Sequence, residues 1–405
     1  MRIWVAAIMI LIGCLLLTQF SQDRASNAAK TECRDSSVAQ LKVIFDHLDS
    51  QVNNGDGYKD YLNPDGFPTG ALLAWSESYL MQAYAEMFRA TGDEKYLDKL
   101  SEHVKSVLNN RDDYRGELDY KGDLVPAWGT NRFTKNGAWK HFVAHTGMIT
   151  YPMLEFVFLV REHGVSRLSA QAEGVLEKVE ESIRYHDDQW VVQEAGYGLY
   201  VYREDFYHKP NYVCPLSQQA VMGRSLLLLG ELTGSKVYLR QASDIATAIK
   251  ASLQDNGNEG YVWGVFVSDK QEDTTVADIS HSTATIDFAM LAYQAGIVFD
   301  QTDMGRFART VKALWQNGRV PRYIDGTGDY TYEIAAGQYA FLAQFDLEIW
   351  DLCHDLLFKM YKVDIIGRYL QEDWWGTVML SIARLACFLP LNCLASTNSV
   401  MGADI

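Results

Sequence analysis

The feature that most constrains this fold is a glycine that recurs at the end of apolar helical segments. Gly92, Gly164, Gly234 and Gly296 are separated by 72, 70 and 62 residues. The residues before each glycine have the apolar spacing of a helix, and a second helical segment follows three of the four glycines. Glycine in the left-handed conformation commonly ends a helix, so each unit is predicted to be a helical hairpin. A recurring period of this kind indicates a repeat architecture.

The apolar spacing predicts an inner and an outer helix in each hairpin. Inner helices are predicted to begin near Ala71, His145, Ser217, Ser280, Ile334 and Trp375. Outer helices are predicted over residues 94–109, 167–185, 236–253, 302–316 and 347–361. The helical segment 38–48 and the last inner helix each lack a hairpin partner, and pairing the two ends would close a ring. The predicted fold is therefore all-α, an (α/α)6 toroid of six helical hairpins.

The N-terminus differs in composition from the rest of the chain. Met1-Arg2 precedes an apolar run over residues 3–17, and polar residues and Ala28-Ala29 follow it. This is the pattern of an export signal, so residues 1–29 are predicted to be a signal peptide or, if uncleaved, an N-terminal membrane anchor. We expect a single toroid domain over 30–395, a C-terminal tail over 396–405, and a location in the periplasm, the cell envelope or the medium.

Composition excludes several classes of partner. The formal net charge of −16 argues against binding to a nucleic-acid backbone. No glycine-rich loop fits a nucleotide, and the single Cys353-His354 pair lacks the second pair that a zinc site needs. We therefore expect no cofactor and no metal, and contact with a membrane only through the N-terminal segment.

The connections between hairpins are long, and they are predicted to open at one mouth of the ring. They cover residues 110–144, 186–214, 254–279 and 317–333, next to the amino ends of the inner helices. Long ordered loops usually carry function. These connections are rich in Trp, Tyr and Arg, including Trp128, Arg132, Trp139, Tyr197, Tyr200, Tyr202, Tyr207, Tyr212, Tyr261, Trp263, Arg322, Tyr323, Tyr330 and Tyr332. Flat faces with polar edges suit stacking on sugar rings, which predicts a cleft for a poly- or oligosaccharide. The alternative is that these side chains only fix the loops.

Two histidines are candidate proton-transfer groups. His145 and His281 occupy the first turns of two predicted inner helices, so their imidazoles are predicted to face each other over the cleft floor. A histidine near its ordinary pKa can take or give a proton in a transition state. Tyr212 is a third candidate, and Tyr330 is an alternative to it. Each of these side chains has the alternative role of a packed core residue.

Amide side chains at the start of the third inner helix are candidates for holding the substrate. Asn211, Gln218 and Gln219 lie there, and Arg132 lies in an earlier connection. Neutralising contacts to a uronate carboxylate make the proton on the adjacent carbon removable, and helix N-termini add positive partial charge. We therefore expect an acidic sugar, with Trp75, Trp128, Trp263 and Tyr330 as further substrate contacts.

A carboxylate pair offers a different chemistry. Glu77 follows Trp75 on the first inner helix, and Asp278 is predicted to lie across the ring. Two carboxylates on either side of a glycosidic bond are what a glycoside hydrolase needs. Helix capping by Asp278 and a surface position for Glu77 are the alternatives.

Four segments resemble a known group of carbohydrate-active proteins. They are Trp75-Ser76-Glu77-Ser78, the segment from Pro215 to Arg224, Tyr261-Val262-Trp263, and Asp278-Ile279-Ser280-His281. They are similar to the toroidal proteins related to the C-terminal domain of D-glucuronyl C5-epimerase and to (α/α)-toroid polysaccharide lyases, over roughly residues 60–345.

The resemblance implies abstraction of the C5 proton of a uronate. Departure of the C4 substituent would then give a lyase, and return of the proton on the other face would give an epimerase. His145, His281 and Tyr212 are the candidate catalytic residues, with Gln218, Asn211 and Arg132 on the carboxylate. A glycoside hydrolase and a non-catalytic glycan-binding envelope protein are the alternatives.

Overall fold

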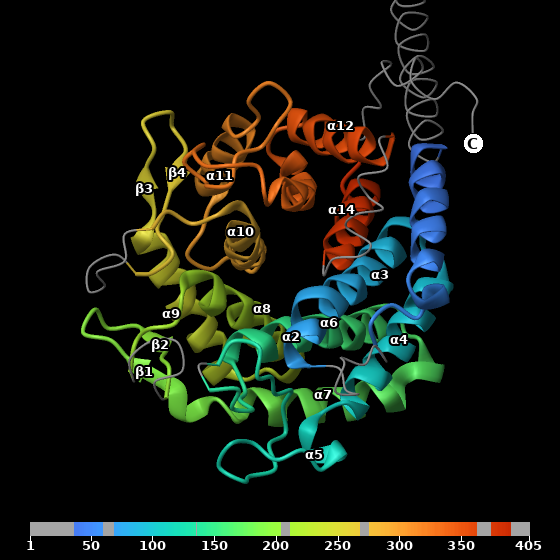
Figure 1. Cartoon of the computed structure of the whole chain (residues 1–405), viewed down its shortest axis with the longest axis vertical. Coiled ribbons are helices and arrows are strands. Elements are labelled where there is room, and N and C mark those ends of the chain that lie inside the picture. Colours follow the sequence, from blue (N-terminus) through green and yellow to red (C-terminus); the bar gives the residue numbers. More distant parts are fainter. Residues whose placement is uncertain are drawn as a thin grey trace, which may run out of the picture.

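The computed structural model shows a ring of helical hairpins, as predicted (Figure 1). It describes residues 36–59, 69–134, 136–203, 211–267, 275–362 and 374–389. The inner ring consists of α3 (Ser78–Thr91), α6 (Val143–Glu162), α8 (Leu216–Thr233), α10 (Ile279–Gln294), the 3-10 helix η5 (Glu333–Gln344) and α14 (Trp375–Cys387). The outer helices are α4 (Glu94–Asn109), α7 (Ser169–Arg184), α9 (Lys236–Ser252), α11 (Gln301–Ala313) and α12 (Glu348–Lys362). The (α/α)6 toroid is therefore confirmed.

The glycine stops adopt the conformation that the sequence predicts. Gly92, Gly164, Gly234 and Gly296 have φ values of 66°, 62°, 71° and 72°. In this left-handed region a side chain would be strained, so glycine ends the helix and lets the chain reverse. Each outer helix consequently follows its inner helix after only a few residues.

Shorter elements lie at the ends of the hairpins. The first inner helix continues from α2 (Gly70–Leu72) through a π-helical turn, η2 (Leu73–Glu77), into α3. Single turns are η1 (Asn53–Gly55), α5 (Asp112–Arg115), η3 (Ser166–Leu168) and η4 (Asp187–Gln189). Two antiparallel ribbons pair β1 (Trp190–Val192) with β2 (Gly198–Tyr200), and β3 (Gln254–Asp255) with β4 (Tyr261–Val262). Both ribbons lie in the connections between hairpins.

The ring closes where α14 packs against α3. Gly376 lies so close to the carbonyl oxygen of Ser76 that a Cβ at residue 376 would be 2.1 Å from it. The helix over residues 36–51 packs on α3 and α4, where Phe45 meets Tyr84 and Tyr96 with ring centroids 6.1 and 5.6 Å apart. The first and last inner helices therefore form the closing seam.

A buried polar layer crosses the axis of the ring. Arg384 on α14 donates to Asp287 on α10 at 2.7 Å, and Arg224 on α8 donates to the same carboxylate oxygen at 3.3 Å. Arg224 also donates to Gln82 on α3 at 3.1 Å. The three charged residues line a cavity of about 490 Å³ at the carboxyl ends of the inner helices. The polar layer thus separates that end of the ring from the mouth.

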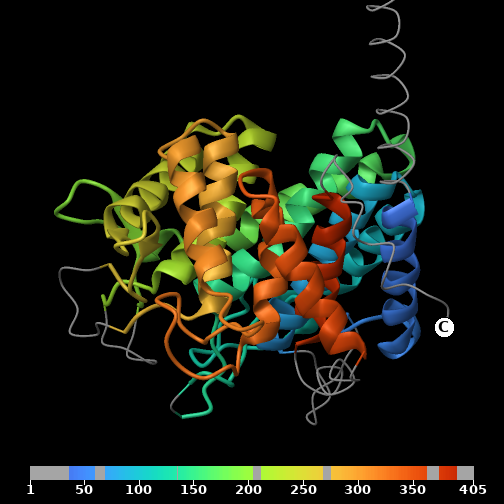
Figure 2. The same cartoon turned by 90° about the horizontal axis from the view of Figure 1, so that it is seen from above.

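The long connections gather at one end of the ring. In Figure 2 the connection before α6 (teal) and the one before η5 (orange) both project from the lower end of the molecule. This is the end at which the inner helices begin, as the sequence predicts. Within the described residues, only α6 is long and apolar enough to cross a membrane, and it is almost wholly buried as a core helix. The predicted signal segment lies outside the described residues.

Candidate active site

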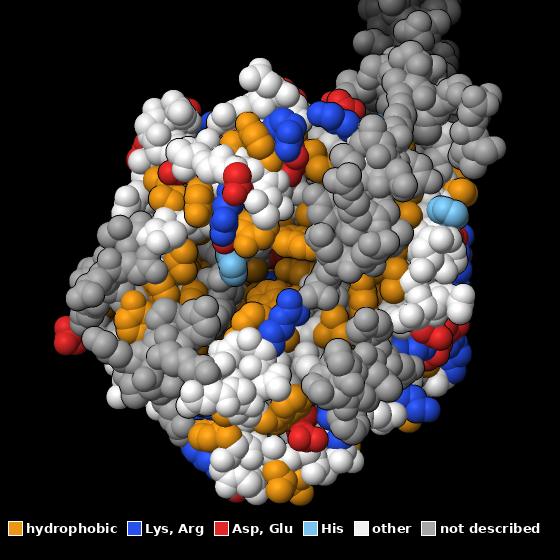
Figure 3. Space-filling view, viewed as in Figure 1, with side chains coloured by type: hydrophobic (Ala, Val, Ile, Leu, Met, Phe, Trp, Pro, Cys, Tyr) orange, Lys and Arg blue, Asp and Glu red, His pale blue; other side chains and the backbone are white. Residues whose placement is uncertain are grey.

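The mouth of the ring contains a cavity of about 330 Å³. Its walls come from the first turns of inner helices and from two connections, and Figure 3 shows hydrophobic side chains lining the hollow at the centre of this face. The described residues that line it are Trp75, Tyr79, Arg132, Phe133, Ser280, His281, Tyr332, Ala335, Gln338, Trp374 and Thr377. An aromatic cavity with a few polar groups is the usual form of a small-ligand site.

His281 and Asp278 form a hydrogen-bonded pair at this cavity. Asp278 is the N-cap of α10, and its Oδ1 accepts from the backbone nitrogens of Ser280 and His281, each at 3.0 Å. Its Oδ2 lies 2.6 Å from Nδ1 of His281. Because a carboxylate only accepts, Nδ1 of His281 carries a proton. Nε2 is then the ring nitrogen that can exchange a proton with a ligand.

Each member of the pair stabilises the charged form of the other. Burial opposes the charged form of both groups, but their mutual hydrogen bond and attraction outweigh it. The pKa of Asp278 falls to about 2, and the pKa of His281 rises above its ordinary 6.5. The His281 side chain is 52% exposed, so a ligand in the cavity can reach it. The imidazole can therefore take and return a proton near neutral pH.

Aromatic rings and one arginine surround the dyad. The rings of Tyr332 and Trp374 lie 5.5 Å apart between centroids with a 35° tilt, and Trp75 lines the same cavity. The Arg132 guanidinium lies 5.8 Å from the centroid of Phe133. None of the described residues that line this cavity carries a carboxylate. Asp278 is not among them and is connected to the cavity by its hydrogen bond to His281. The site thus offers stacking faces, a proton-transfer group and positive charge.

Contrary to the prediction, His145 does not face His281. Its ring is buried among those of Trp75, Phe133 and Phe142, with centroids 6.1, 5.7 and 5.1 Å away. Burial, aided by nearby positive groups, lowers its pKa to about 3. His145 is therefore a neutral ring that supports the aromatic wall.

Glu77 is turned away from the cavity. It is fully buried, its Oε1 lies 2.5 Å from Nδ1 of His103 on α4, and its Oε2 accepts from the backbone nitrogen of Tyr58 at 2.8 Å. Both oxygens thus hold the first inner helix to the outer layer. The predicted carboxylate pair of Glu77 and Asp278 does not meet across the mouth.

Two predicted tryptophan contacts also point toward the outer layer. Trp128 is buried and its Nε1 donates to the carbonyl oxygen of Val107 at 2.8 Å. Trp263 is buried with its ring centroid 5.7 Å from that of Phe307 on α11. Both rings fix connections to outer helices, which is the alternative role considered for the loop aromatics.

The polar residues predicted around the third inner helix stabilise its connection. Gln219 is fully buried, and its amide exchanges bonds with the backbone of Tyr200 at 2.7 and 3.1 Å. Gln218 accepts from the hydroxyl of Tyr202 at 3.0 Å. Asn211 has a φ of 63° and donates its backbone N–H to Tyr202 at 2.8 Å, as a turn residue does.

The two candidate tyrosines lie on loops outside the cavity lining. The ring of Tyr212 packs edge-on against Phe266 with a centroid separation of 5.3 Å. Tyr330 is exposed, with the Arg319 guanidinium 4.1 Å from its ring centroid. Of the predicted site residues, the structure brings together Trp75, Arg132 and His281, with Asp278 behind.

Sequence reasoning missed several cavity residues. Tyr79 lies one turn after Trp75, Thr377 lies three residues after Trp374, and Gln338 lies on η5. The available signal was helical spacing, since positions i, i+3 and i+4 share a helix face. Extending each helix start by one turn would have found Tyr79 and Thr377.

Comparison with known proteins supports the fold. No family model matches the chain, and no curated protein matches its sequence. An inactive variant of the alpha-1,6-mannanase of Salegentibacter sp. HEL1_6, in complex with alpha-1,6-mannotetrose, is similar with a TM-score of 0.53 and 14% identity, over 85% of this chain and 99% of that chain. Cellobiose 2-epimerase from Bacillus thermoamylovorans has a TM-score of 0.51 and 11% identity, over 81% and 88%. Cellobiose 2-epimerase from Spirochaeta thermophila has a TM-score of 0.50 and 11% identity, over 86% and 97%.

Proposed function

We propose that the chain is an exported carbohydrate-active enzyme that removes the C5 proton of a uronate residue in an acidic polysaccharide. The observation that carries the proposal is the His281–Asp278 dyad at an aromatic cavity with Arg132 on its rim. The C–H next to a carboxylate becomes acidic enough to remove when positive groups stabilise the charge that develops on the oxygens. Export rests on the N-terminal composition alone.

The proton transfers balance within the cavity. Nε2 of neutral His281 takes the C5 proton, and the C–H electron pair moves onto the carboxylate, where Arg132 stabilises it. Asp278 holds the imidazolium that forms. In the lyase branch, the electron pair then forms the C4–C5 double bond as the C4 oxygen leaves with a proton. In the epimerase branch, C5 takes a proton from the opposite face.

Tyr79 is the proposed proton donor that acts together with the base His281. It lines the cavity, and burial raises its pKa to about 12, so its hydroxyl remains protonated at neutral pH. A neutral phenol can give its proton to a leaving oxygen or to a carbanion. Tyr79 replaces Tyr212 in this role, because Tyr212 is not among the residues that line the cavity.

The similar structures agree with a sugar substrate in this kind of ring. One of them is described in complex with an oligosaccharide, and two others are epimerases. The mannanase also favours a second candidate, a glycoside hydrolase. The described cavity lining has no carboxylate pair, so we rank hydrolysis second.

The experiment is turnover on a panel of uronans in deuterated buffer. An ultraviolet-absorbing unsaturated product supports the lyase branch, and deuterium at C5 without chain cleavage supports the epimerase branch. New reducing ends without ultraviolet absorbance would support the hydrolase instead. The absence of all three signals, with oligosaccharide still bound, would refute catalysis and leave a glycan-binding protein.

A matched variant tests the dyad. His281→Asn keeps a side-chain donor near the position of Nδ1, facing Asp278, and removes Nε2. We expect turnover to fall by about 100-fold or more, since general base catalysis contributes about 10²–10⁴. Folding and sugar binding should be retained. Full activity in His281→Asn would exclude this histidine as the base.

A further inference from the structure

A third cavity, with a polar lining, lies between the connection before α6 and the end of α7. Its volume is about 440 Å³, and its lining includes Asp119, Tyr185, Gln189, Arg203 and His141. The same connection carries Arg132 and Phe133 to the mouth, but no described residue is shared between the two cavity linings. This third cavity is therefore separate from the cavity at the mouth.

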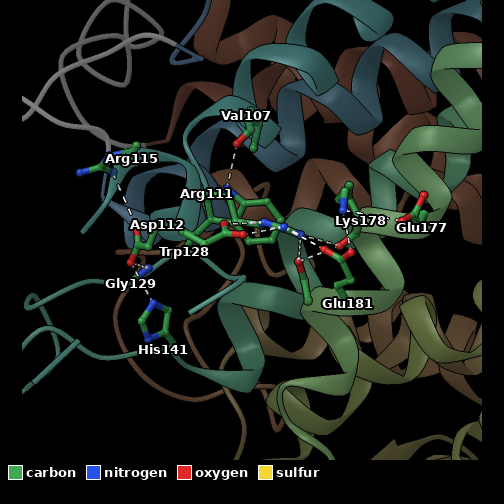
Figure 4. A network of polar contacts seen from close by, with 12 residues as sticks. Val107, Arg111, Asp112, Arg115, Trp128, Gly129, His141, Glu177, Lys178 and Glu181 are labelled. Atoms are coloured by element: carbon green, nitrogen blue, oxygen red, sulfur yellow. Dashed lines mark hydrogen bonds and ion pairs between the residues drawn. The ribbon is translucent and has the colours of Figure 1, made fainter. Parts of the chain in front are cut away.

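His141 at this cavity forms a dyad with a buried carboxylate (Figure 4). Its Nε2 lies 2.8 Å from Oδ2 of Asp112. The same oxygen accepts from the backbone nitrogen of Gly129 at 3.0 Å and from Nε1 of Trp139 at 2.6 Å. An oxygen that already accepts from two other donors acts as an acceptor toward His141 as well. Nε2 must then donate, so in neutral His141 the remaining nitrogen, Nδ1, is an acceptor.

Nδ1 of His141 has no hydrogen-bond partner among the described residues. The side chain is only 1% exposed, and the residue lines the cavity. Buried polar atoms are nearly always paired, so an unpaired acceptor beside a cavity points to a ligand or water that donates to it. For the neutral imidazole, the tautomer that Asp112 selects calls for a partner that donates to Nδ1.

The charges in the cavity select against an ionic ligand. Its described lining carries four carboxylates and three cationic side chains, so neither sign dominates. Arg203 is paired with Asp188, and Oδ1 of Asp119 accepts from the backbone of Lys121 and Asp123 at 2.8 and 2.9 Å. Such internal pairs leave little net field for a phosphate or a carboxylate. An uncharged ligand with hydroxyl groups fits the nearly balanced charges of the lining and can donate a hydrogen bond to Nδ1 of His141.

We propose that this cavity is a secondary binding site for an uncharged sugar residue, one hydroxyl of which donates to Nδ1 of His141. The proposal does not depend on catalysis at the mouth. It predicts that neutral sugars bind even if no uronan is turned over.

The experiment uses saturation-transfer NMR with cellobiose and mannobiose as neutral probes, and ethanolamine as a cationic one. The full chain should bind both disaccharides in preference to ethanolamine. His141→Gln keeps a donor toward Asp112 and leaves nothing at the position of Nδ1. We expect it to weaken disaccharide binding by about tenfold, the effect of one lost hydrogen bond, with an unchanged melting temperature.

His141→Asn is the reverse control, since it places a polar atom near Nδ1 and loses the bond to Asp112. It should lower the melting temperature. The proposal is overturned if His141→Gln binds disaccharide as well as the parent, if the parent binds only ethanolamine, or if no probe binds and a crystal structure shows only a water at Nδ1.

Discussion

The closing seam of the ring offers a sharp test of the fold, through the substitution Gly376→Ala. A Cβ at this position would lie 2.1 Å from the carbonyl oxygen of Ser76 and 2.9 Å from Cβ of Tyr79. Neither atom is the end of a flexible side chain, so neither can swing aside. The first and last inner helices would have to separate by roughly 1 Å to reach ordinary van der Waals distance.

The expected cost follows from two opposing effects. Overpacking a tight interface typically costs about 1–3 kcal/mol. Alanine is favoured over glycine inside a helix by about 1 kcal/mol, which offsets part of this cost. Because the contacts are to backbone and Cβ atoms, we expect a cost at the upper end of the range, which leaves a net loss of about 2 kcal/mol after the helix propensity is subtracted. For a domain of this size that corresponds to a fall of roughly 3 °C in melting temperature.

Gly174→Ala is the matched control. Gly174 lies inside the outer helix α7, and an added Cβ would meet nothing within 4 Å. This substitution should raise stability by up to about 1 kcal/mol. Both variants are compared by thermal and guanidinium unfolding, and sugar binding is followed by tryptophan fluorescence. Gly376→Ala should also weaken binding, because Trp75 and Trp374 line the cavity from opposite sides of the seam. If it proves as stable as Gly174→Ala, the helices do not meet as described.

Three further predictions concern charge. His281 must be neutral to accept a proton, so kcat/KM should fall as the pH falls through the raised pKa of His281. Asp278→Asn keeps a capping side chain but removes the negative charge. This variant should therefore move the fall in kcat/KM to lower pH. A pH profile that does not move would contradict the dyad. Glu77→Ala breaks a buried pair and should cost about 3–5 kcal/mol in denaturant unfolding, yet leave turnover per folded molecule unchanged; lost turnover would return Glu77 to the active site. Burial lowers the pKa of His145 to about 3, so below its unfolded value of 6.5 only the unfolded chain gains this proton. Stability should therefore fall as pH falls from about 6.5 toward 3, by up to about 1.4 kcal/mol per unit, and the fall should be shallower in His145→Phe. Equal slopes in the two proteins would rule out a neutral buried His145.

The helices could be predicted because local chemistry sets their ends. Inner helices start within about two residues of the predicted positions, and the glycine stops have positive φ as expected. Glycine at a helix end acts through its own backbone, so no knowledge of distant residues is needed. The seam between α14 and α3 depends on residues about 300 positions apart, and only the need to hide two open ends suggested it.

The site was harder to predict because a side chain on a connection can point in two directions. Trp128 and Trp263 are of the residue type that stacks on sugar rings, but both side chains point into the outer layer. Glu77 lies two residues after Trp75, yet Trp75 lines the cavity and Glu77 faces His103. Adjacent helical positions differ by about 100° in direction, so nearness in sequence does not place two side chains in one site.

The two histidines show which signal would have separated them. His145 and His281 are each the third residue of an inner helix, and each follows its N-cap residue by three positions. The cap is Asp278 before His281 and Phe142 before His145. A carboxylate cap accepts from the imidazole and holds it at the helix end beside the mouth, whereas a phenyl ring packs on it and helps to bury it. The residue three positions before each histidine therefore distinguishes a proton-transfer group from a core ring. A carboxylate at that position binds the imidazole by a hydrogen bond, whereas a phenyl ring packs against it and buries it.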